Sequence, residues 1–253
     1  MVERDVISEK DINIVPLGDL HIGSQQCNIS KIKSVVDSIL NTENKYCVLL
    51  GDLCDTGLKN SKTLVYEEIV PVSEQLIIVE KLLRPLVEKG KILAMVSGNH
   101  ENRVLKEVGI DFSKVIAKDL GIEDLYRKEI AFLKLRINPK QGYHYPVYSF
   151  AITHGNGGGN VAFINKNQQF GTMIDGIDCL VTAHTHKPVV TVPSKLVVNI
   201  QTGTVSTSPF YCVTSSSFLE YGGYAIEKMF APNSIKPQVI TCDCDKKHMS
   251  VTL

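Results

Sequence analysis

The stretch Asn13-Ile-Val-Pro-Leu-Gly-Asp-Leu-His21 joins a short apolar run to a polar cluster that begins with glycine. Near-continuous apolarity over so few residues is typical of a strand that is covered on both faces. The glycine allows the backbone to turn sharply where the strand ends, and this turn places the following side chains at the end of the strand. An apolar run followed at once by a polar cluster recurs four times, and two of these clusters also begin with glycine. The clusters Gly51-Asp-Leu-Cys-Asp55, Gly98-Asn-His-Glu101, Thr153-His-Gly155 and Ala183-His-Thr-His186 follow the runs Tyr46–Leu50, Lys91–Val96, Val147–Thr153 and Cys179–Thr182.

Segments with helical spacing separate the first three apolar runs, and this alternation predicts a largely parallel sheet. Ser30 and Ser73 are each placed to cap one of these helices. A further short helix is predicted at Ser113–Leu120, where Gly121 would end it. The alternating pattern of Lys134–Phe150 indicates a hairpin.

The length of the chain, 253 residues, suits one large α/β domain. Because no Pro/Ser/Gly-rich linker interrupts the sequence, we expect residues 1–253 to form a single domain. After Pro188 the residues Val, Thr, Ser and Tyr dominate and helical periodicity fades, which predicts mostly strands. One run there, Leu196–Gln201, has the same apolar composition as the runs above and is also expected to be covered on both faces.

Charge and cysteine content indicate which partners and which cellular compartment to expect. Lys plus Arg and Asp plus Glu both number 27, so no global basic field favours nucleic acid or anionic membranes. The seven cysteines are odd in number and scattered, which favours reduced thiols in a cytosol. Since no stretch approaches the length of a membrane span, we expect a cytoplasmic protein without a membrane partner. Nothing in the residue pattern indicates an oligomeric state.

The polar clusters contain the donors of a metal site. Because loops beyond the carboxyl ends of strands line the ligand crevice of an open α/β sheet, clusters far apart in sequence can meet there. Carboxylate, imidazole and amide donors without a thiolate suit Mn, Fe, Zn or Ni. Seven candidates exceed the needs of one ion but suit two ions about 3.5–4 Å apart that share a carboxylate. The candidates are Asp19, His21, Asp52, Asn99, His154, His184 and His186.

The order of these clusters resembles the calcineurin-like metallophosphoesterase family, whose pattern is Asp-x-His, Gly-Asp-x-x-Asp, Gly-Asn-His-Glu/Asp, His and Gly-His-x-His. All five elements occur here in that order, from Asp19 to His186. The resemblance implies an α/β fold with two packed mixed β-sheets flanked by helices, a four-layer sandwich. It places the active site at the carboxyl ends of the strands. The strand-rich end, residues 188–253, would then complete the second sheet.

The resemblance also implies roles for individual residues. Asp19, His21 and His186 would bind one divalent ion, Asn99, His154 and His184 would bind the other, and Asp52 would bridge them. A metal-bound hydroxide would attack phosphorus in line, because metal coordination lowers the pKa of water from about 15.7 towards 7. His100 would protonate the leaving oxygen, and Asp55 would orient His100. We expect Mn²⁺, with Fe, Zn or Ni as alternatives.

Some positions depart from the family pattern or extend it. Ala183 replaces the usual glycine, which fits unless the backbone there requires a positive φ. The Arg-Gly pair of protein phosphatases is absent after Asp55, so protein phosphatase activity is less supported. Backbone N–H groups at Gly157 and Gly158 could cradle a phosphate, although a plain flexible turn is an equal alternative. Arg103 could bind a substrate phosphate with two hydrogen bonds, although a surface salt bridge is an alternative use.

These observations predict a metal-dependent phosphatase or phosphodiesterase that acts on a small phosphate ester. A DNA exonuclease or endonuclease of the same family is an alternative. It is disfavoured by the neutral charge and because only Lys187 to Leu253 remains for the capping domain that such nucleases carry. A non-catalytic metal-binding scaffold is a third reading, and the intact His100 argues against it.

Overall fold

The five apolar runs that precede polar clusters are strands in the computed structural model, which describes residues 1–59, 68–140, 143–157 and 162–252. Each strand ends within one or two residues of its polar cluster. The five strands are β2 (Ile12–Leu17), β3 (Lys45–Leu49), β4 (Ile92–Val96), β7 (Val147–Thr153) and β8 (Cys179–Thr182).

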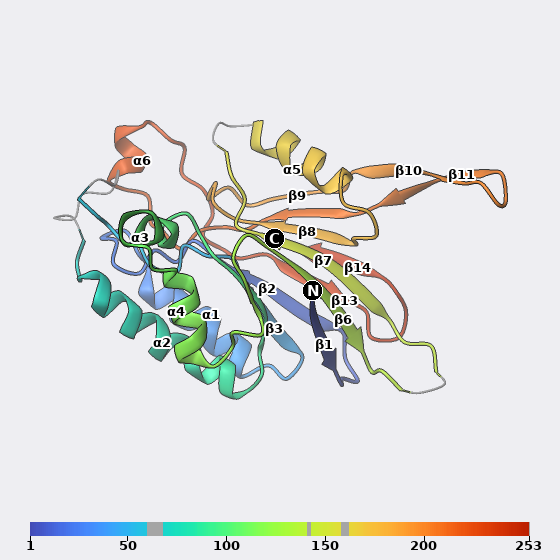
Figure 1. Ribbon diagram of the computed structural model, residues 1–253, viewed down its shortest axis with the longest axis horizontal. Helices are drawn as coiled ribbons and strands as arrows, with labels where there is room; N and C mark the ends of the chain where they lie inside the picture. Colours follow the sequence, from blue (N-terminus) through green and yellow to red (C-terminus); the bar gives the residue numbers. More distant parts are fainter. Residues whose placement is uncertain (60–67, 141–142, 158–161, 253) are drawn as a thin grey trace.

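One six-stranded sheet has the order β14-β13-β2-β3-β4-β5. Its strands from β2 to β5 (Tyr126–Arg127) run parallel, whereas β13 (Val239–Cys242) pairs antiparallel with β2 and with β14 (Met249–Thr252). Helices α1 (Ile29–Leu40), α2 (Val72–Glu88) and α4 (Phe112–Leu120) lie together on its outer side (Figure 1).

The other six-stranded sheet has the order β1-β6-β7-β8-β12-β9. Strand β6 (Ile130–Ile137) pairs antiparallel with β7, as the hairpin pattern predicts, and parallel with β1 (Val2–Val6). At the opposite edge β12 (Tyr211–Thr214) runs parallel to β8 and antiparallel to β9 (Val189–Thr191). Helix α5 (Ala162–Thr172) lies on the outer side of this sheet (Figure 1).

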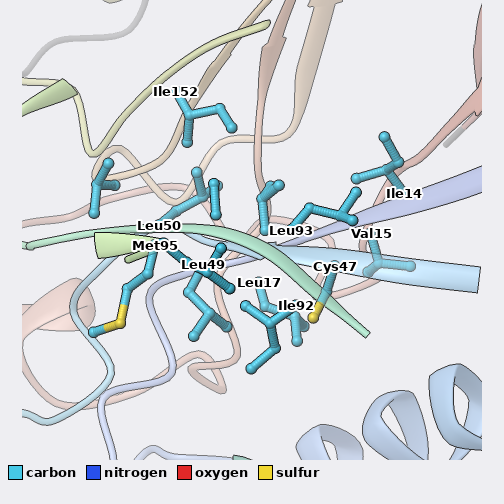
Figure 2. Close-up of a cluster of buried hydrophobic side chains, with 14 of the residues drawn as sticks. Ile14, Val15, Leu17, Cys47, Leu49, Leu50, Ile92, Leu93, Met95 and Ile152 are labelled. Atoms are coloured by element: carbon cyan, nitrogen blue, oxygen red, sulfur yellow. The ribbon is translucent and has the colours of Figure 1, made fainter. Parts of the chain in front are cut away.

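The main hydrophobic core fills the space between the two sheets and under the helices. Figure 2 shows buried side chains of β2, β3 and β4 together with Ile152 of β7, which belongs to the other sheet. Leu17, Leu49 and Met95 have no exposed surface, and burying each such side chain contributes roughly 1.5–3 kcal/mol. The four layers, helices, sheet, sheet and helix, confirm the α/β sandwich expected from the sequence.

The helix boundaries differ in detail from the sequence prediction. Helix α1 is capped by Asn28, whose side chain accepts a hydrogen bond from the Lys31 amide, rather than by Ser30. Helix α2 begins after Pro71, because the fixed φ of proline suits a helix start, so Ser73 lies inside the first turn. Helix α4 ends at Gly121 in the left-handed conformation, as predicted.

The strands after Pro188 divide between both sheets and a separate ribbon. Strands β10 (Ser194–Asn199) and β11 (Thr204–Pro209) pair only with each other among the described strands. They project beyond the two sheets (Figure 1). The prediction that Leu196–Gln201 is covered on both faces is therefore wrong: Leu196 is 77% exposed and Ile200 is 86% exposed. A short helix, α6 (Tyr224–Glu227), interrupts the strand-rich end.

Within the described residues, no helix is both long enough and apolar enough to cross a membrane. All seven cysteines have free thiols, and six of them are buried.

Candidate metal centre

The five polar clusters meet where the two sheets come together at the carboxyl ends of β2, β3, β4, β7 and β8. Hydrogen bonds tie the strand ends across the sheets. The His154 imidazole donates from Nδ1 to the Leu50 carbonyl over 2.7 Å, and the His184 amide donates to Asp19 Oδ2 over 2.9 Å. The Ala183 amide donates to the His154 carbonyl. Residues separated by up to 165 positions are thereby fixed within one cluster.

The backbone at this cluster is strained. Only a few per cent of residues other than glycine adopt a positive φ, and such residues gather at functional sites. Five of the seven predicted ligands do so here: Asp19 (50°), His21 (47°), Asp52 (48°), His184 (70°) and His186 (56°). Ala183 does not, so the alanine in place of the family's glycine carries no backbone penalty.

Two motif glycines are required for space. Gly51 and Gly98 lie back to back, and a Cβ at Gly51 would overlap the backbone of Gly98. A Cβ at Gly98 would overlap the amide and carboxylate of Asp52. Gly51 also has a φ of 79°, which a side chain would strain further. The close approach of these two loops places Asp52 beside Asn99.

Asp19, His21 and His186 form the first group of donors. Their ligand atoms lie within 4.8 Å of one another. The Nε2 atoms of His21 and His186 are 3.2 Å apart, and they lie 3.9 and 3.5 Å from Asp19 Oδ1. That oxygen is buried and accepts no hydrogen bond from any described residue. A buried carboxylate oxygen without a partner is costly, and a cation in this position would satisfy it.

Asn99, His154 and His184 form the second group. The Oδ1 atom of Asn99 lies 2.9 Å from His154 Nε2 and 2.6 Å from His184 Nδ1. Asp52 lies between the two groups, because its Oδ2 atom is 3.2 Å from His154 Nε2 and 3.9 Å from His21 Nε2. The structure thus brings all seven predicted ligands together, with Asp52 in the central position.

Hydrogen bonds orient two imidazoles for metal binding. His21 Nδ1 lies 2.9 Å from Asp55 Oδ1, and His154 Nδ1 lies 2.7 Å from the Leu50 carbonyl oxygen. When Nδ1 donates its proton outward in this way, Nε2 is left as the ligand atom. In both residues Nε2 faces Asp52. The donor set and its outward hydrogen bonds therefore fit divalent ions of the Mn, Fe, Zn or Ni class.

The electrostatics of the cluster follow from its buried carboxylates. Burial alone would raise the pKa of Asp52, but the charges of His154 and His100 outweigh it and hold that pKa well below its usual value. Burial alone would lower the pKa of His154, but the carboxylate of Asp52 raises it to about 10. Burial and the nearby charge of His100 lower the pKa of His21, which keeps this imidazole neutral. A divalent ion bound through Nε2 of His154 would therefore have to displace a proton.

His100 and Asp55 lie beside the cluster. His100 Nδ1 is 2.6 Å from the Asp55 carbonyl oxygen and 3.1 Å from its carboxylate, and His100 Nε2 is 3.8 Å from Asp52 Oδ2. Asp55 contacts both His21 and His100, and these hydrogen bonds lower the pKa of Asp55 although burial opposes the shift.

The guanidinium of Arg103 contacts the outer nitrogen of His100. Arg103, in helix α3 (Glu101–Val108), places Nη2 2.8 Å from His100 Nε2 and donates from Nη1 to the Asp55 carbonyl over 3.3 Å. Because a guanidinium only donates, His100 Nε2 must accept here, and the imidazole proton lies on Nδ1. Burial lowers the pKa of His100, but the charge of Asp52 outweighs it and raises the pKa above its usual value. The 2.8 Å contact with Arg103 nevertheless leaves no space for a proton on Nε2, so this nitrogen is unprotonated in the present arrangement.

Glu101 has a role that the sequence interpretation did not assign. Its buried carboxylate accepts hydrogen bonds from the backbone amides of both motif loops. The donors are Asp52 (2.9 Å), Leu53 (2.6 Å), Cys54 (3.0 Å) and Gly98 (3.1 Å). In the sequence, the only indication of this role is that Glu101 is the last residue of the motif Gly98-Asn-His-Glu101. The fold is needed to show that its side chain holds the loop of Asp52.

The glycine-rich loop after His154 is described only in part. Gly155 and Gly157 have left-handed φ values of 87° and 118°. A Cβ at Gly157 would lie 3.8 Å from Lys166 Nζ, so a cation stands next to this loop. Gly158 lies outside the described residues.

Comparisons with known proteins agree with this geometry. The family model described as calcineurin-like phosphoesterase matches residues 12–188, which include every residue of the seven-residue cluster. A solved structure of a conserved uncharacterized protein from Streptococcus pneumoniae TIGR4, described as a predicted phosphoesterase, is similar with 12% sequence identity and a TM-score of 0.39. The similarity covers 96% of this chain and 89% of that chain, and it is too distant to bear on function. No curated protein matches the chain significantly.

Proposed function

The chain belongs to the calcineurin-like phosphoesterase family, which makes it a metal-dependent phosphoric ester hydrolase, and we propose that it works with two divalent ions bound at the seven-residue cluster. The observation that carries this proposal is the central position of the Asp52 carboxylate. It lies within 4 Å of imidazole nitrogens from both donor groups. The buried Asp19 oxygen that lacks a hydrogen-bond donor among the described residues supports a cation in the first group.

The ligands divide three and three around a shared carboxylate. Asp19, His21 and His186 hold one ion, and Asn99, His154 and His184 hold the other, with Asp52 between them. Bound divalent ions supply an activated water and neutralise charge on the phosphoryl oxygens. We propose Mn²⁺ as the resident ion, because carboxylate, amide and imidazole donors without thiolate suit it. The same donors accommodate Fe, Zn or Ni.

His100 is the proposed proton donor to the leaving oxygen, and Asp55 is the residue that orients it. The contacts of His100 Nδ1 with Asp55 fix the ring so that Nε2 faces the side of Asp52 and Arg103. Arg103 must leave Nε2 before this nitrogen can carry a proton. A phosphoryl oxygen that accepts from the guanidinium would draw Arg103 away, so substrate binding and protonation of His100 are linked. Arg103 thus acts as a substrate-binding residue.

The proposed substrate is a small phosphate monoester or diester. The chain has equal numbers of acidic and basic residues, so the charge needed to hold a nucleic acid backbone is missing overall. Gly157 lies beside Lys166, which supports a phosphate-facing role for this loop. We further propose that residues 1–253 form one domain and that the protein acts in a reducing cytoplasm, which the seven free thiols support.

Hydrolysis of bis-nitrophenyl phosphate with Mn²⁺ tests the proposal. We expect Asp52→Asn to lower kcat/KM on the order of 1,000-fold, because loss of the shared carboxylate removes several kcal/mol of transition-state stabilisation. Asp37→Asn, an exposed position on α1, is the matched control and should retain full activity. Unchanged hydrolysis by Asp52→Asn would refute the assignment. Mono-nitrophenyl phosphate and labelled single- and double-stranded DNA, assayed in parallel, separate phosphatase, phosphodiesterase and nuclease activity.

A further inference from the structure

The β10–β11 ribbon is a defined structural element. Strands β9 and β12 pair at the edge of their sheet, and the Phe210 amide donates to the Pro193 carbonyl, so the pairing continues directly into β10 and β11. At the tip the Asn199 side chain accepts hydrogen bonds from the amides of Gln201 and Thr202. The ribbon therefore forms an arm, residues 194–209, that extends beyond both sheets (Figure 1).

One face of the arm is apolar and exposed. Leu196 lies opposite Thr207, and Val198 lies opposite Val205. Alternate residues of a strand share a face, so Leu196, Val198 and Val205 project on the same side. They are 77%, 65% and 65% exposed, and Ile200 at the tip is 86% exposed. These residues have the composition of the buried strands of this protein, but nothing in the described chain covers them.

Beyond Lys195 and Pro209 at its base, the arm lacks the usual protection of its edges against strand pairing. No described strand pairs with the outer edge of β10 or β11. Exposed edge strands commonly carry lysine or other charged residues that prevent association. Here the sequence between Lys195 and Glu220 contains no charged residue, although charged residues make up 21% of the chain. A two-stranded ribbon alone is only marginally stable in water, which favours a covering partner.

We propose that the arm is a dimerisation element that pairs with the arm of a second copy of this chain about a twofold axis. An apolar face packed against the same face of a second copy is self-complementary, which is the property that a twofold interface needs. The apolar faces of the two arms would pack against each other across the axis, which would remove Leu196, Val198 and Val205 from water. Lys195 is the only charged residue of the arm and lies at its base beside Asp175, so the projecting part offers no charge to a phosphate backbone or to a charged peptide. The zero net charge of the chain removes long-range repulsion between copies.

Sedimentation velocity at several protein concentrations tests this proposal. The wild-type protein should sediment as a dimer with twice the 28.0 kDa mass of one chain. The double variant Leu196→Lys/Val198→Lys should raise the dimer dissociation constant at least about 100-fold, because like charges would face each other across the axis. Ile7→Lys, at a position 73% exposed and outside the arm, is the matched control and should remain dimeric. Circular dichroism of each variant checks that it is folded.

Fluorescence locates the interface independently of mass. The chain contains no tryptophan, so Leu196→Trp introduces a single reporter. Its emission should shift to shorter wavelength as the concentration rises, whereas the emission of Ile7→Trp should not change. The proposal would be overturned by a wild-type monomer at all concentrations, or by a dimer that survives the double lysine substitution. An emission shift that appears only with neutral phosphatidylcholine vesicles would also overturn it and would assign the arm to a membrane surface.

Discussion

The seven-residue cluster and the β10–β11 arm depart from the usual distribution of side chains in opposite directions. In the cluster, both carboxylates and the imidazoles of His21 and His154 are buried, and Asp19 Oδ1 has no hydrogen-bond donor among the described residues. In the arm, leucine, valine and isoleucine are exposed on a regular ribbon without strain at those positions. Buried polar groups and exposed apolar faces both carry a cost in the isolated chain. The buried carboxylate of Asp19 is therefore suited to a cation, and the exposed face of the arm is suited to the proposed second copy.

The difference between the regions lies in how each is held. The cluster is fixed by hydrogen bonds from both sheets and by left-handed backbone at five ligands. The arm is held at its base, where Lys195 Nζ lies 3.8 Å from Asp175 and 5.5 Å from the centre of the Phe210 ring. Substitutions in the cluster should therefore affect chemistry strongly, whereas substitutions in the arm should affect association alone.

Removal of the proposed proton donor should give the largest effect. We expect His100→Asn to lower kcat about 10²–10⁴-fold for an ester with an alkoxide leaving group, which needs a proton. The loss should be much smaller for a nitrophenyl ester, whose leaving group departs as a stable anion. Steady-state kinetics with both ester types provides the comparison. Equal losses on both would assign His100 to the cluster's structure rather than to proton transfer.

Glu101→Gln tests whether one side chain holds the Asp52 loop. The amide cannot accept all four backbone hydrogen bonds as the carboxylate does, so the loop should loosen. We expect Mn²⁺ affinity to fall about 10–100-fold, as for other residues that orient metal ligands. Glu107→Gln, an exposed position on the same helix, is the control. Calorimetric titration measures both variants, and equal affinities would contradict the positioning role.

The raised pKa of His154 predicts a pH dependence of metal binding. Its value of about 10 in the folded protein lies above the ordinary 6.5, so the metal-free protein holds a proton that an ion must displace. Affinity for Mn²⁺ should therefore rise about tenfold per pH unit between 6.5 and 10. In the metal-free protein, the stability from this proton is complete below pH 6.5 and is lost as the pH rises through 10.

Calorimetry in two buffers of different ionisation enthalpy at pH 7 and pH 8 measures the protons released. One proton per chain and a tenfold gain in affinity are expected. Identical affinity at the two pH values would show that His154 is already unprotonated without metal.

The smallest effect should appear in the arm. Leu196→Ala should change the free energy of unfolding of the dilute monomer by less than about 0.5 kcal/mol, since the side chain is 77% exposed. Leu49→Ala, with no exposed surface, should cost about 2–5 kcal/mol because it leaves a cavity. Urea denaturation of both variants gives the two values. A large loss from Leu196→Ala would mean that the arm packs against its own chain.

The residue pattern predicts much of the fold and most of the site. The five runs were identifiable because buried parallel strands need continuous apolar residues, and Asp19 to His186 were identifiable because metal donors follow those runs directly. Strand β1 was missed because the segment Glu3-Arg-Asp5 reads as polar, although its backbone pairs with β6. The exposure of Leu196–Gln201 was also missed. The apolar composition of a strand indicates that its faces should be packed against other residues. It does not indicate whether those residues belong to the same chain.

Contacts that depend on three dimensions were beyond the residue pattern. The four hydrogen bonds of Glu101 require two loops that meet only after folding. Arg103 and His100 are only three residues apart in the sequence. Their contact could not be predicted because it depends on how helix α3 is oriented relative to Asp55.

The most direct test of the central claim is the number of ions per active chain. Metal-free protein would be titrated with Mn²⁺, and bound metal, measured by mass spectrometry, would be compared with hydrolysis of bis-nitrophenyl phosphate in the same samples. We predict two Mn²⁺ ions per wild-type chain, with activity appearing as the second ion binds. Asp52→Asn should bind fewer than two ions and remain inactive. Full activity of the wild-type protein with one ion per chain would contradict the two-metal account.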